Sequence, residues 1–184
     1  FSNRALLESV DETASAIGLD YSNRVSAFVR DKIIFTEELA VNPYIVNPPS
    51  REQIVSILED SLRRNPQFTG VNYGDLQGNM IRAKGDTAYL GDREYYQQAI
   101  RTKKTTISDP LLSRGSGRLS LAIAAPVMRN GEVVSVIQVT MPLDSLNELV
   151  KEIKFKDSGY GFIIDQSGML IAHARNPELN GKLN

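Results

Sequence analysis

The stretch "RLSLAIAAPVMRNGEVVSVIQVTM", from Arg118 to Met141, decides the fold class of this chain. It holds two runs rich in apolar and β-branched residues, which favour strands. Asn130-Gly131 lies between the runs, and this dipeptide is typical of a tight hairpin turn. Pro126 predicts a bulge or an edge in the first strand, because proline cannot donate a ladder hydrogen bond. The stretch therefore predicts a long antiparallel hairpin.

Two further hairpins lie on either side of this one. "QFTGVNYGDLQGNMIRA" turns at Asp75–Gly78, and "YGFIIDQSGMLIAHA" turns at Asp165–Gly168. A shift of 90 residues aligns the two D-x-x-G turns and the apolar residues that follow them. Recurrence of one motif in the same local context indicates two copies of one structural unit. The first copy is complete, and the second stops after its first hairpin.

Helices are predicted between and before these hairpins. Apolar residues from Leu6 to Leu39 recur at about the 3.6-residue period of an α-helix, and Pro43 ends that pattern. Ser50 is a good N-cap for a second helix that begins at Arg51. Asp92 is expected to cap a short helix from Arg93 to about Arg101, and another helix is expected after Met141.

Together these elements predict an α+β fold. A long N-terminal helix leads into a PAS-like module with an antiparallel sheet of about five strands and a helix inserted between the second and third. One sheet face packs on helices, and the other can line a pocket. We expect three segments: a stalk helix and linker over 1–49, a ligand-binding module over 50–154, and the incomplete start of a second module over 155–184.

Composition narrows the classes of function. The 184 residues are 41% apolar and 23% charged with a net charge of −1, as in soluble globular proteins. No basic field points to nucleic acid or anionic lipid, and the absence of cysteine excludes disulfides and thiolate metal sites. The chain has no apolar run of transmembrane length. We expect no cofactor.

The stretch "AYLGDREYYQQAI", from Ala88 to Ile100, holds the main candidate site. Arg93 lies among Tyr89, Tyr95 and Tyr96, and an arginine fork suits a carboxylate or phosphate. Two interpretations stay open: Arg93 anchors a ligand, or it forms a structural ion pair with Asp92, Glu94 or Asp109. Tyr95 and Tyr96 point to different helix faces, so one of them belongs to the core.

Other polar residues are weaker candidates. Tyr73 and Asn72 could line the pocket from the first hairpin, and Ser113, Ser120 and Thr140 could supply hydroxyls to a carboxylate. His173 lacks the partners that a metal or catalytic site needs, so we interpret it as structural. The chain carries no nucleophile motif such as G-x-S-x-G.

In this order the motifs resemble the double Cache family of extracytoplasmic sensor domains, found in bacterial chemoreceptors, histidine kinases and diguanylate cyclases. The resemblance rests on the long N-terminal helix with "NPYI", on "GDREYYQQAI" followed by "TTISDPLLSRGSG", on "AIAAPVMRNGEVVSVIQVTMPLDSL", and on "GYGFIIDQSGMLIAH". It implies a stalk helix, a membrane-distal module that binds the ligand and a membrane-proximal module. It also implies transmembrane helices at both ends of the domain, which place it outside the cytoplasm.

Family members that bind amino acids hold the ligand carboxylate with an arginine and two following aromatics, and Arg93, Tyr95 and Tyr96 match these. Tyr89 lies near the position of a preceding tyrosine. The ligand ammonium is held by acids on later strands. This chain has Leu111 and Ser113 in place of a tyrosine and an aspartate, and Thr140 in place of the other acid. A buried ammonium needs an anionic partner, so the resemblance favours a short organic acid over an amino acid or amine. Asp109 could still reach the ligand.

We therefore expect a non-catalytic ligand-sensing domain, in first place that of a methyl-accepting chemoreceptor and next that of a histidine kinase or diguanylate cyclase. The resemblance also implies a homodimer through the N-terminal helix. Two alternatives from other classes are a PAS-like enzyme acting on a small acid and a structural spacer without a ligand.

Overall fold

The computed structural model describes residues 24, 27–145, 162–164 and 170–173. The chain divides into two compact units, of which Asp31–Leu143 lies wholly within the described residues. The other unit comprises Phe1–Arg30 with Asp144–Asn184. Its described strands, β8 (Phe162–Ile164) and β9 (Leu170–His173), pair antiparallel and confirm the predicted third hairpin. The turn of that hairpin lies outside the described residues.

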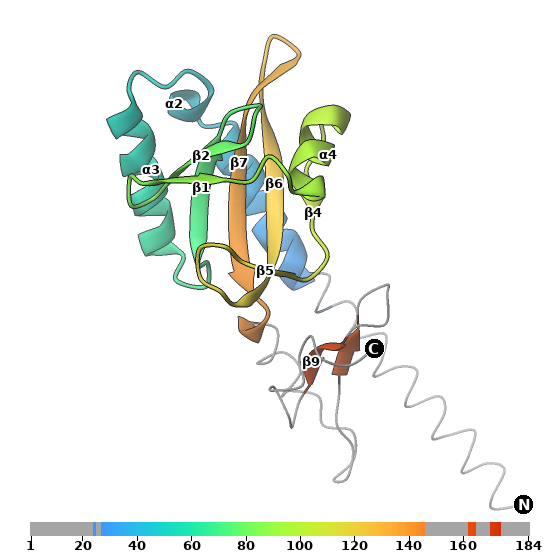
Figure 1. The fold of residues 1–184 in the computed structure, drawn as a ribbon. Coiled ribbons are helices and arrows are strands. Elements are labelled where there is room, and N and C mark those ends of the chain that lie inside the picture. Colours follow the sequence, from blue (N-terminus) through green and yellow to red (C-terminus); the bar gives the residue numbers. More distant parts are fainter. Residues whose placement is uncertain (1–23, 25–26, 146–161, 165–169, 174–184) are drawn as a thin grey trace, which may run out of the picture. The chain divides into compact units, whose positions relative to one another are not determined.

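Seven antiparallel strands form one sheet in Asp31–Leu143 (Figure 1). Their order is β3-β2-β1-β7-β6-β4, and β5 also pairs with β6. The strands are β1 (Gly70–Gly74), β2 (Asn79–Arg82), β3 (Thr87–Tyr89), β4 (Thr106–Ile107), β5 (Leu111–Leu112), β6 (Leu119–Arg129) and β7 (Glu132–Pro142).

The predicted central hairpin is confirmed as β6 and β7. Asn130 and Gly131 form its turn with φ values of 52° and 79°, which few residues other than asparagine and glycine adopt. The strand register shifts between Val127 and Met128, directly after Pro126. Proline thus lies beside an irregularity in the ladder, as its missing N–H predicts.

Helices surround this sheet. Residues 27–40 are helical and are followed by α2 (Pro43–Val46), α3 (Arg51–Arg64) and α4 (Glu94–Thr102). The Ser50 hydroxyl accepts a hydrogen bond from the backbone N–H of Gln53 at 3.2 Å, which confirms the predicted N-cap. The helical stretch ends just before Asn42-Pro43, also as predicted. Residues 1–23 of the predicted stalk, and most of the helix expected after Met141, lie outside the described residues.

One prediction about α4 is wrong. Arg93, not Asp92, is the N-cap residue, and no side chain accepts a hydrogen bond from the first turn. The Asp92 carboxylate instead binds the guanidinium of Arg114. An ionic partner from a distant loop has therefore replaced a local cap, and the charged hydrogen bonds of that pair are the stronger kind.

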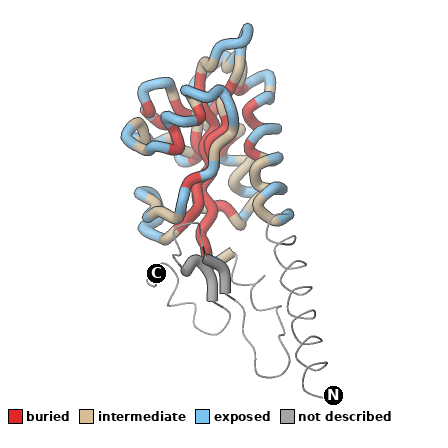
Figure 2. Tube along the Cα trace, turned by 90° about the vertical axis from the view of Figure 1, so that its right-hand side faces the viewer, coloured by how far each residue is buried: buried red, intermediate tan, exposed pale blue. Residues whose placement is uncertain are grey.

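Alternation along the long strands gives the sheet two buried faces. Ala122 and Ala124 of β6 lie opposite Thr140 and Gln138 of β7, so all four share one face. On this face α4 covers a cluster of buried residues: Met80, Tyr95, Tyr96, Ala99, Ala122, Ala124 and Val136. Figure 2 shows the buried positions running along these strands. In Figure 1 the helical residues 31–40 pass behind the opposite face.

The sheet differs from expectation at its edges. Seven strands replace the expected five because Thr87–Tyr89 adds β3 beside β2 and Leu111–Leu112 adds β5 beside β6. The inserted helix follows the third strand rather than the second. Each of these additional strands has only two or three residues, too few to show the alternation by which a strand is recognised.

The Asp75–Gly78 turn fixes the entry to α4. Asp75 Oδ1 accepts hydrogen bonds from the backbone N–H groups of Gln77 and Asn79, both at 2.9 Å, and Gly78 has a φ of 89°. The Gly78 carbonyl accepts from the Leu90 N–H at 2.9 Å. The turn thus holds the segment that leads to Arg93.

No helix among the described residues is long and apolar enough to cross a membrane.

Candidate functional site

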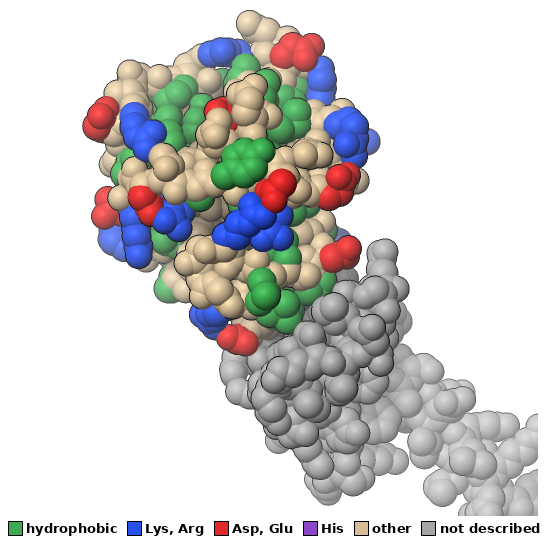
Figure 3. Space-filling view, viewed as in Figure 1, with side chains coloured by type: hydrophobic (Ala, Val, Ile, Leu, Met, Phe, Trp, Pro, Cys, Tyr) green, Lys and Arg blue, Asp and Glu red, His purple; other side chains and the backbone are tan. Residues whose placement is uncertain are grey.

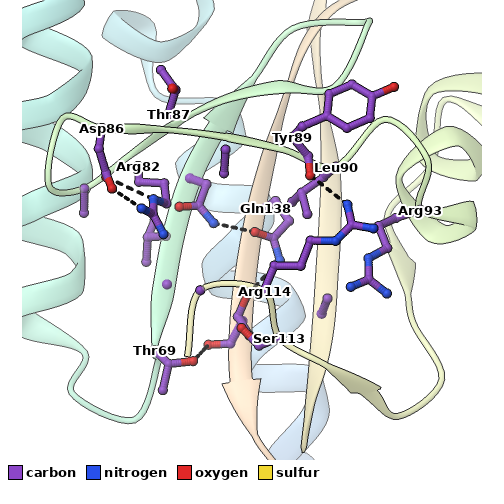
Figure 4. Close-up of a pocket in the computed structure, with 18 of the residues that line it drawn as sticks. Thr69, Arg82, Asp86, Thr87, Tyr89, Leu90, Arg93, Ser113, Arg114 and Gln138 are labelled. Atoms are coloured by element: carbon purple, nitrogen blue, oxygen red, sulfur yellow. Dashed lines mark hydrogen bonds and ion pairs between the residues drawn. The ribbon is translucent and has the colours of Figure 1, made fainter. Parts of the chain in front are cut away.

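A cavity of about 610 Å³ opens on the sheet face that α4 covers (Figure 4). Its walls come from the β2–β3 turn, the segment before α4, and the loop between β5 and β6. Figure 3 shows basic side chains across the middle of the same face. The lining residues are Leu62, Thr69, Gly70, Val71, Asn72, Arg82, Ala83, Lys84, Asp86, Thr87, Ala88, Tyr89, Leu90, Arg93, Tyr95, Leu111, Ser113, Arg114, Gly115, Ala122, Gln138 and Thr140.

The floor of the cavity is a chain of hydrogen-bonded polar side chains on β1 and β7. Asn72 Nδ2 donates to Gln138 Oε1 at 2.6 Å, and Gln138 Nε2 donates to Thr140 Oγ1 at 2.9 Å. All three residues are buried, and Asn72 is the register partner of Gln138. These hydrogen-bonded side chains provide a fixed polar surface for a ligand, because buried polar groups that bond to one another keep a single conformation.

Arg93 stands at the N-terminus of α4 with its guanidinium in the cavity wall. In the described part of the chain, its one side-chain hydrogen bond runs from Nη2 to the Leu112 carbonyl at 3.1 Å. Its Nε is buried and has no hydrogen-bond partner. An unsatisfied buried donor on a charged group is costly, so the site is suited to an anion that completes its hydrogen bonds.

The ion pairs considered for Arg93 are made by other residues. Asp92 binds Arg114, with Nη1 to Oδ1 at 2.7 Å, and Glu94 binds Arg101 at 3.0 Å. Asp109 is exposed and lies outside the cavity lining. Arg93 is therefore left with a backbone carbonyl as its partner.

Arg114 is the main residue that sequence reasoning missed. It lines the cavity, makes a two-point contact with Asp92 and donates to the Tyr89 carbonyl at 3.0 Å. This contact ties the β5–β6 loop to the start of α4. Asp92 and Arg114 are 22 positions apart, so no local signal in the sequence predicts their contact.

The remaining candidates divide into two groups. Tyr89, Tyr95, Ser113 and Thr140 line the cavity together with Arg93, whereas Tyr73, Tyr96, Ser120 and Asp109 do not. Tyr96 is the core member of the tyrosine pair: it is fully buried, and its hydroxyl donates to the Asp75 carbonyl at 2.7 Å. Tyr95 lies against the cavity, where burial raises the pKa of its hydroxyl to about 12. The Ser120 hydroxyl donates to the Arg118 carbonyl.

The charge of the lining is strongly one-sided. Its described residues include four basic side chains, Arg82, Lys84, Arg93 and Arg114, and one acidic side chain, Asp86. Asp86 itself is bound by Arg82. Such a cavity attracts anions and repels cations. Among the described residues, no group of three or more acids and histidines is placed to hold a metal ion.

The Asp92–Arg114 contact predicts a specific pH response. Hydrogen bonds from Arg114 lower the pKa of Asp92 from 3.8 to about 2. Because the folded-state pKa is depressed, the contact stabilises the fold above about pH 4, and this contribution is lost as the pH falls through 2. Carboxyl-carbon NMR should give a midpoint near 2 for Asp92. In Arg114→Gln it should move up towards 3.8, and in the control Arg101→Gln it should not. An unchanged midpoint in Arg114→Gln would show that the contact does not form.

This chain is similar to known proteins in sequence and in fold. The family model described as "Cache domain", of the dCache_1 type, matches residues 2–184. The methyl-accepting chemotaxis protein PscA of Pseudomonas syringae pv. tomato is 27% identical over 81 residues, which are 44% of this chain and 13% of that protein. Sporulation kinase D of Bacillus subtilis is 24% identical over 82% of this chain and 30% of that protein. The chain spans less than a third of the length of these relatives.

A solved structure shares the fold. The ligand-binding domain of the Pseudomonas fluorescens chemoreceptor CtaA, in complex with L-serine, superposes with a TM-score of 0.79. The match covers 96% of this chain and 77% of that one at 21% identity. This agreement confirms the predicted α+β, PAS-like architecture.

Proposed function

Since this chain belongs to the Cache domain family, in its double Cache form, we propose that it senses a short organic acid for a bacterial transmembrane receptor. The ligand binds in the cavity beside α4, with a carboxylate on Arg93. The observation that carries this proposal is that Arg93 lines the cavity with a backbone carbonyl, and not a carboxylate, as the described partner of its guanidinium, while its Nε lacks a described hydrogen-bond partner. A carboxylate is planar and accepts two parallel hydrogen bonds from such a fork.

The choice of an acid over an amino acid rests on the lining. Leu111, Ser113 and Thr140, the positions aligned with ammonium-binding residues of the family, all lie at the cavity, and none is acidic. Asp86 is the acid that remains, and Arg82 binds it. An ammonium entering here would lose water without gaining a free carboxylate. CtaA binds L-serine, and this chain would differ from it in ligand class.

The whole receptor is part of the proposal. We place the domain outside the cytoplasm, with residues 1–49 as a stalk and linker, 50–154 as the ligand-binding module and 155–184 as the start of a second module. A chemoreceptor is the first choice for the output and a histidine kinase the second, since a methyl-accepting chemotaxis protein and a sporulation kinase both match this chain. The N-terminal helix would pair with that of a second copy. The domain would bind its ligand without turnover.

A thermal-shift screen tests the ligand class. Short carboxylates, the matching amino acids and the matching amines should each be offered at millimolar concentration. A carboxylate at 100 times its Kd should stabilise the domain by about 2.7 kcal/mol, whereas amines should leave the melting temperature unchanged. If an amino acid raised the melting temperature more than the acid of the same chain length, the proposed ligand class would be wrong.

A further inference from the structure

Arg82 forms a second basic group in the cavity, separate from Arg93. It is the last residue of β2, and its backbone N–H donates to the Asp86 carbonyl at 2.9 Å. Its side chain binds the Asp86 carboxylate through Nε, at 2.9 Å from Oδ1, and through Nη2. The β2–β3 turn thus fixes the direction of this guanidinium.

The contact with Asp86 leaves Nη1 of Arg82 available. Nε and Nη2 form one edge of the guanidinium, and neither hydrogen of Nη1 is used by it. Nη1 is directed towards the β5–β6 loop, where a Cβ added at Gly115 would lie 3.6 Å from it. Gly115 and Arg82 both line the cavity. A ligand group that reaches Nη1 from the cavity would therefore meet two charged N–H donors.

Charge near this position also favours an anion. Lys84 lies two residues beyond Arg82, lines the cavity and is exposed. In Figure 4, Arg82 and Asp86 lie on one side of Gln138, and Arg93 and Arg114 lie on the other. Asn72, Gln138 and Thr140 of the polar floor line the same cavity as both groups.

We propose that Arg82 forms a second anion subsite, so that the ligand is a dicarboxylate with one carboxylate on Arg93 and the other on Arg82. This inference rests on the proposed function, because Arg93 supplies the first anchor. A monocarboxylate would leave Nη1 of Arg82 to water, and an amino acid would bring its ammonium towards Arg82 and Lys84. Hydrogen bonds to a charged group are worth about 1.5–3 kcal/mol, which corresponds to a gain of about tenfold or more in affinity.

Isothermal titration calorimetry of the 184-residue domain tests the subsite. The probes are malonate, succinate, glutarate and adipate, each paired with the monocarboxylate of equal chain length. The best dicarboxylate should bind at least tenfold more tightly than its partner. Arg82→Gln should remove this advantage, lowering the affinity for the dicarboxylate at least tenfold more than the affinity for the monocarboxylate. Arg82→Lys, which keeps the charge, should retain part of it.

A second variant leaves the Arg82–Asp86 contact in place. Gly115→Asp would put a carboxylate beside Nη1, and the space there accepts a Cβ in ordinary contact. It should lower the affinity for the dicarboxylate at least tenfold, and the control Gly115→Asn, of equal size and without charge, should lower it less. Arg63→Gln, which removes an exposed arginine paired with Asp60 outside the cavity, should have no effect.

The outcomes separate the two proposals. If Arg93→Ala abolishes binding of the dicarboxylate while Arg82→Gln and Gly115→Asp leave it within twofold, the second subsite is wrong and the proposed function stands. If no acid of the panel binds, or if Arg93→Ala has no effect on binding, the proposed function fails and the subsite fails with it.

Discussion

Replacing Arg93 with alanine is expected to abolish the stabilisation of this domain by its ligand. The variant removes the Nε donor that lacks a partner and the charge beside it. Each hydrogen bond to a charged group contributes about 1.5–3 kcal/mol, so losing two of them should raise the Kd at least about 100-fold. At a ligand concentration of 100 times the wild-type Kd, the gain of about 2.7 kcal/mol should fall almost to zero.

Two variants make this result specific. Arg101→Ala lies on the same helix, and its partner Glu94 is exposed; it should keep the full ligand response. Arg93→Lys keeps the charge and loses the planar fork, so it should bind more weakly than wild type and better than alanine. If Arg93→Ala melted lower without ligand and still responded fully to it, Arg93 would be a structural residue that supports the Leu112 carbonyl.

The second large effect is expected at the Asp75–Gly78 turn. Gly78→Ala should destabilise the fold by about 2–5 kcal/mol, the sum of left-handed backbone strain of about 1–2 kcal/mol and overpacking of about 1–3 kcal/mol. Gly78 has a φ of 89°, and an added Cβ would overlap the backbone N and Cα of Gly91. Denaturant unfolding measures the loss, and ligand affinity should fall too because Gly91 lies on the segment before Arg93.

Gly131→Ala is the matched control for this prediction. Gly131 has a φ of 79°, close to that of Gly78, and nothing lies within 4 Å of an added Cβ. It should lose only the strain contribution and leave ligand binding unchanged. If the two variants lost the same free energy of unfolding, the close packing of Gly78 against Gly91 would not contribute to the position of the segment before α4.

The fold could be predicted where a short sequence motif by itself determines the local structure. Asn130-Gly131 specifies its turn by backbone conformation alone, and Ser50 caps α3 through a hydrogen bond within its own turn. Asp92 shows the limit of such reasoning. Its place before a helix predicts an N-cap. In the structure its carboxylate instead accepts charged hydrogen bonds from Arg114, which are stronger than a cap to a backbone N–H. The pairing of β5 with β6 brings Arg114 close to it.

The candidate site could be predicted in part for the same reason. Arg93, Tyr89 and Tyr95 belong to one short stretch, and the sequence places them together at the start of α4. Arg82 and Gln138 come from separate strands, and their approach to the same cavity follows from strand order. Tyr95 and Tyr96 were assigned to different faces by helix geometry, and only the packing of α4 decides that Tyr96 is the core residue.

The most direct test of an anion site at Arg93 is the NMR signal of its Nε–H group, assigned by its loss in Arg93→Lys. On titration with succinate, this signal should move downfield to saturation, because the Nε–H gains a carboxylate acceptor. The signal of Arg101 should stay in place. If succinate bound while the Arg93 signal did not move, or if only an amino acid moved it, the carboxylate site proposed for this domain would be wrong.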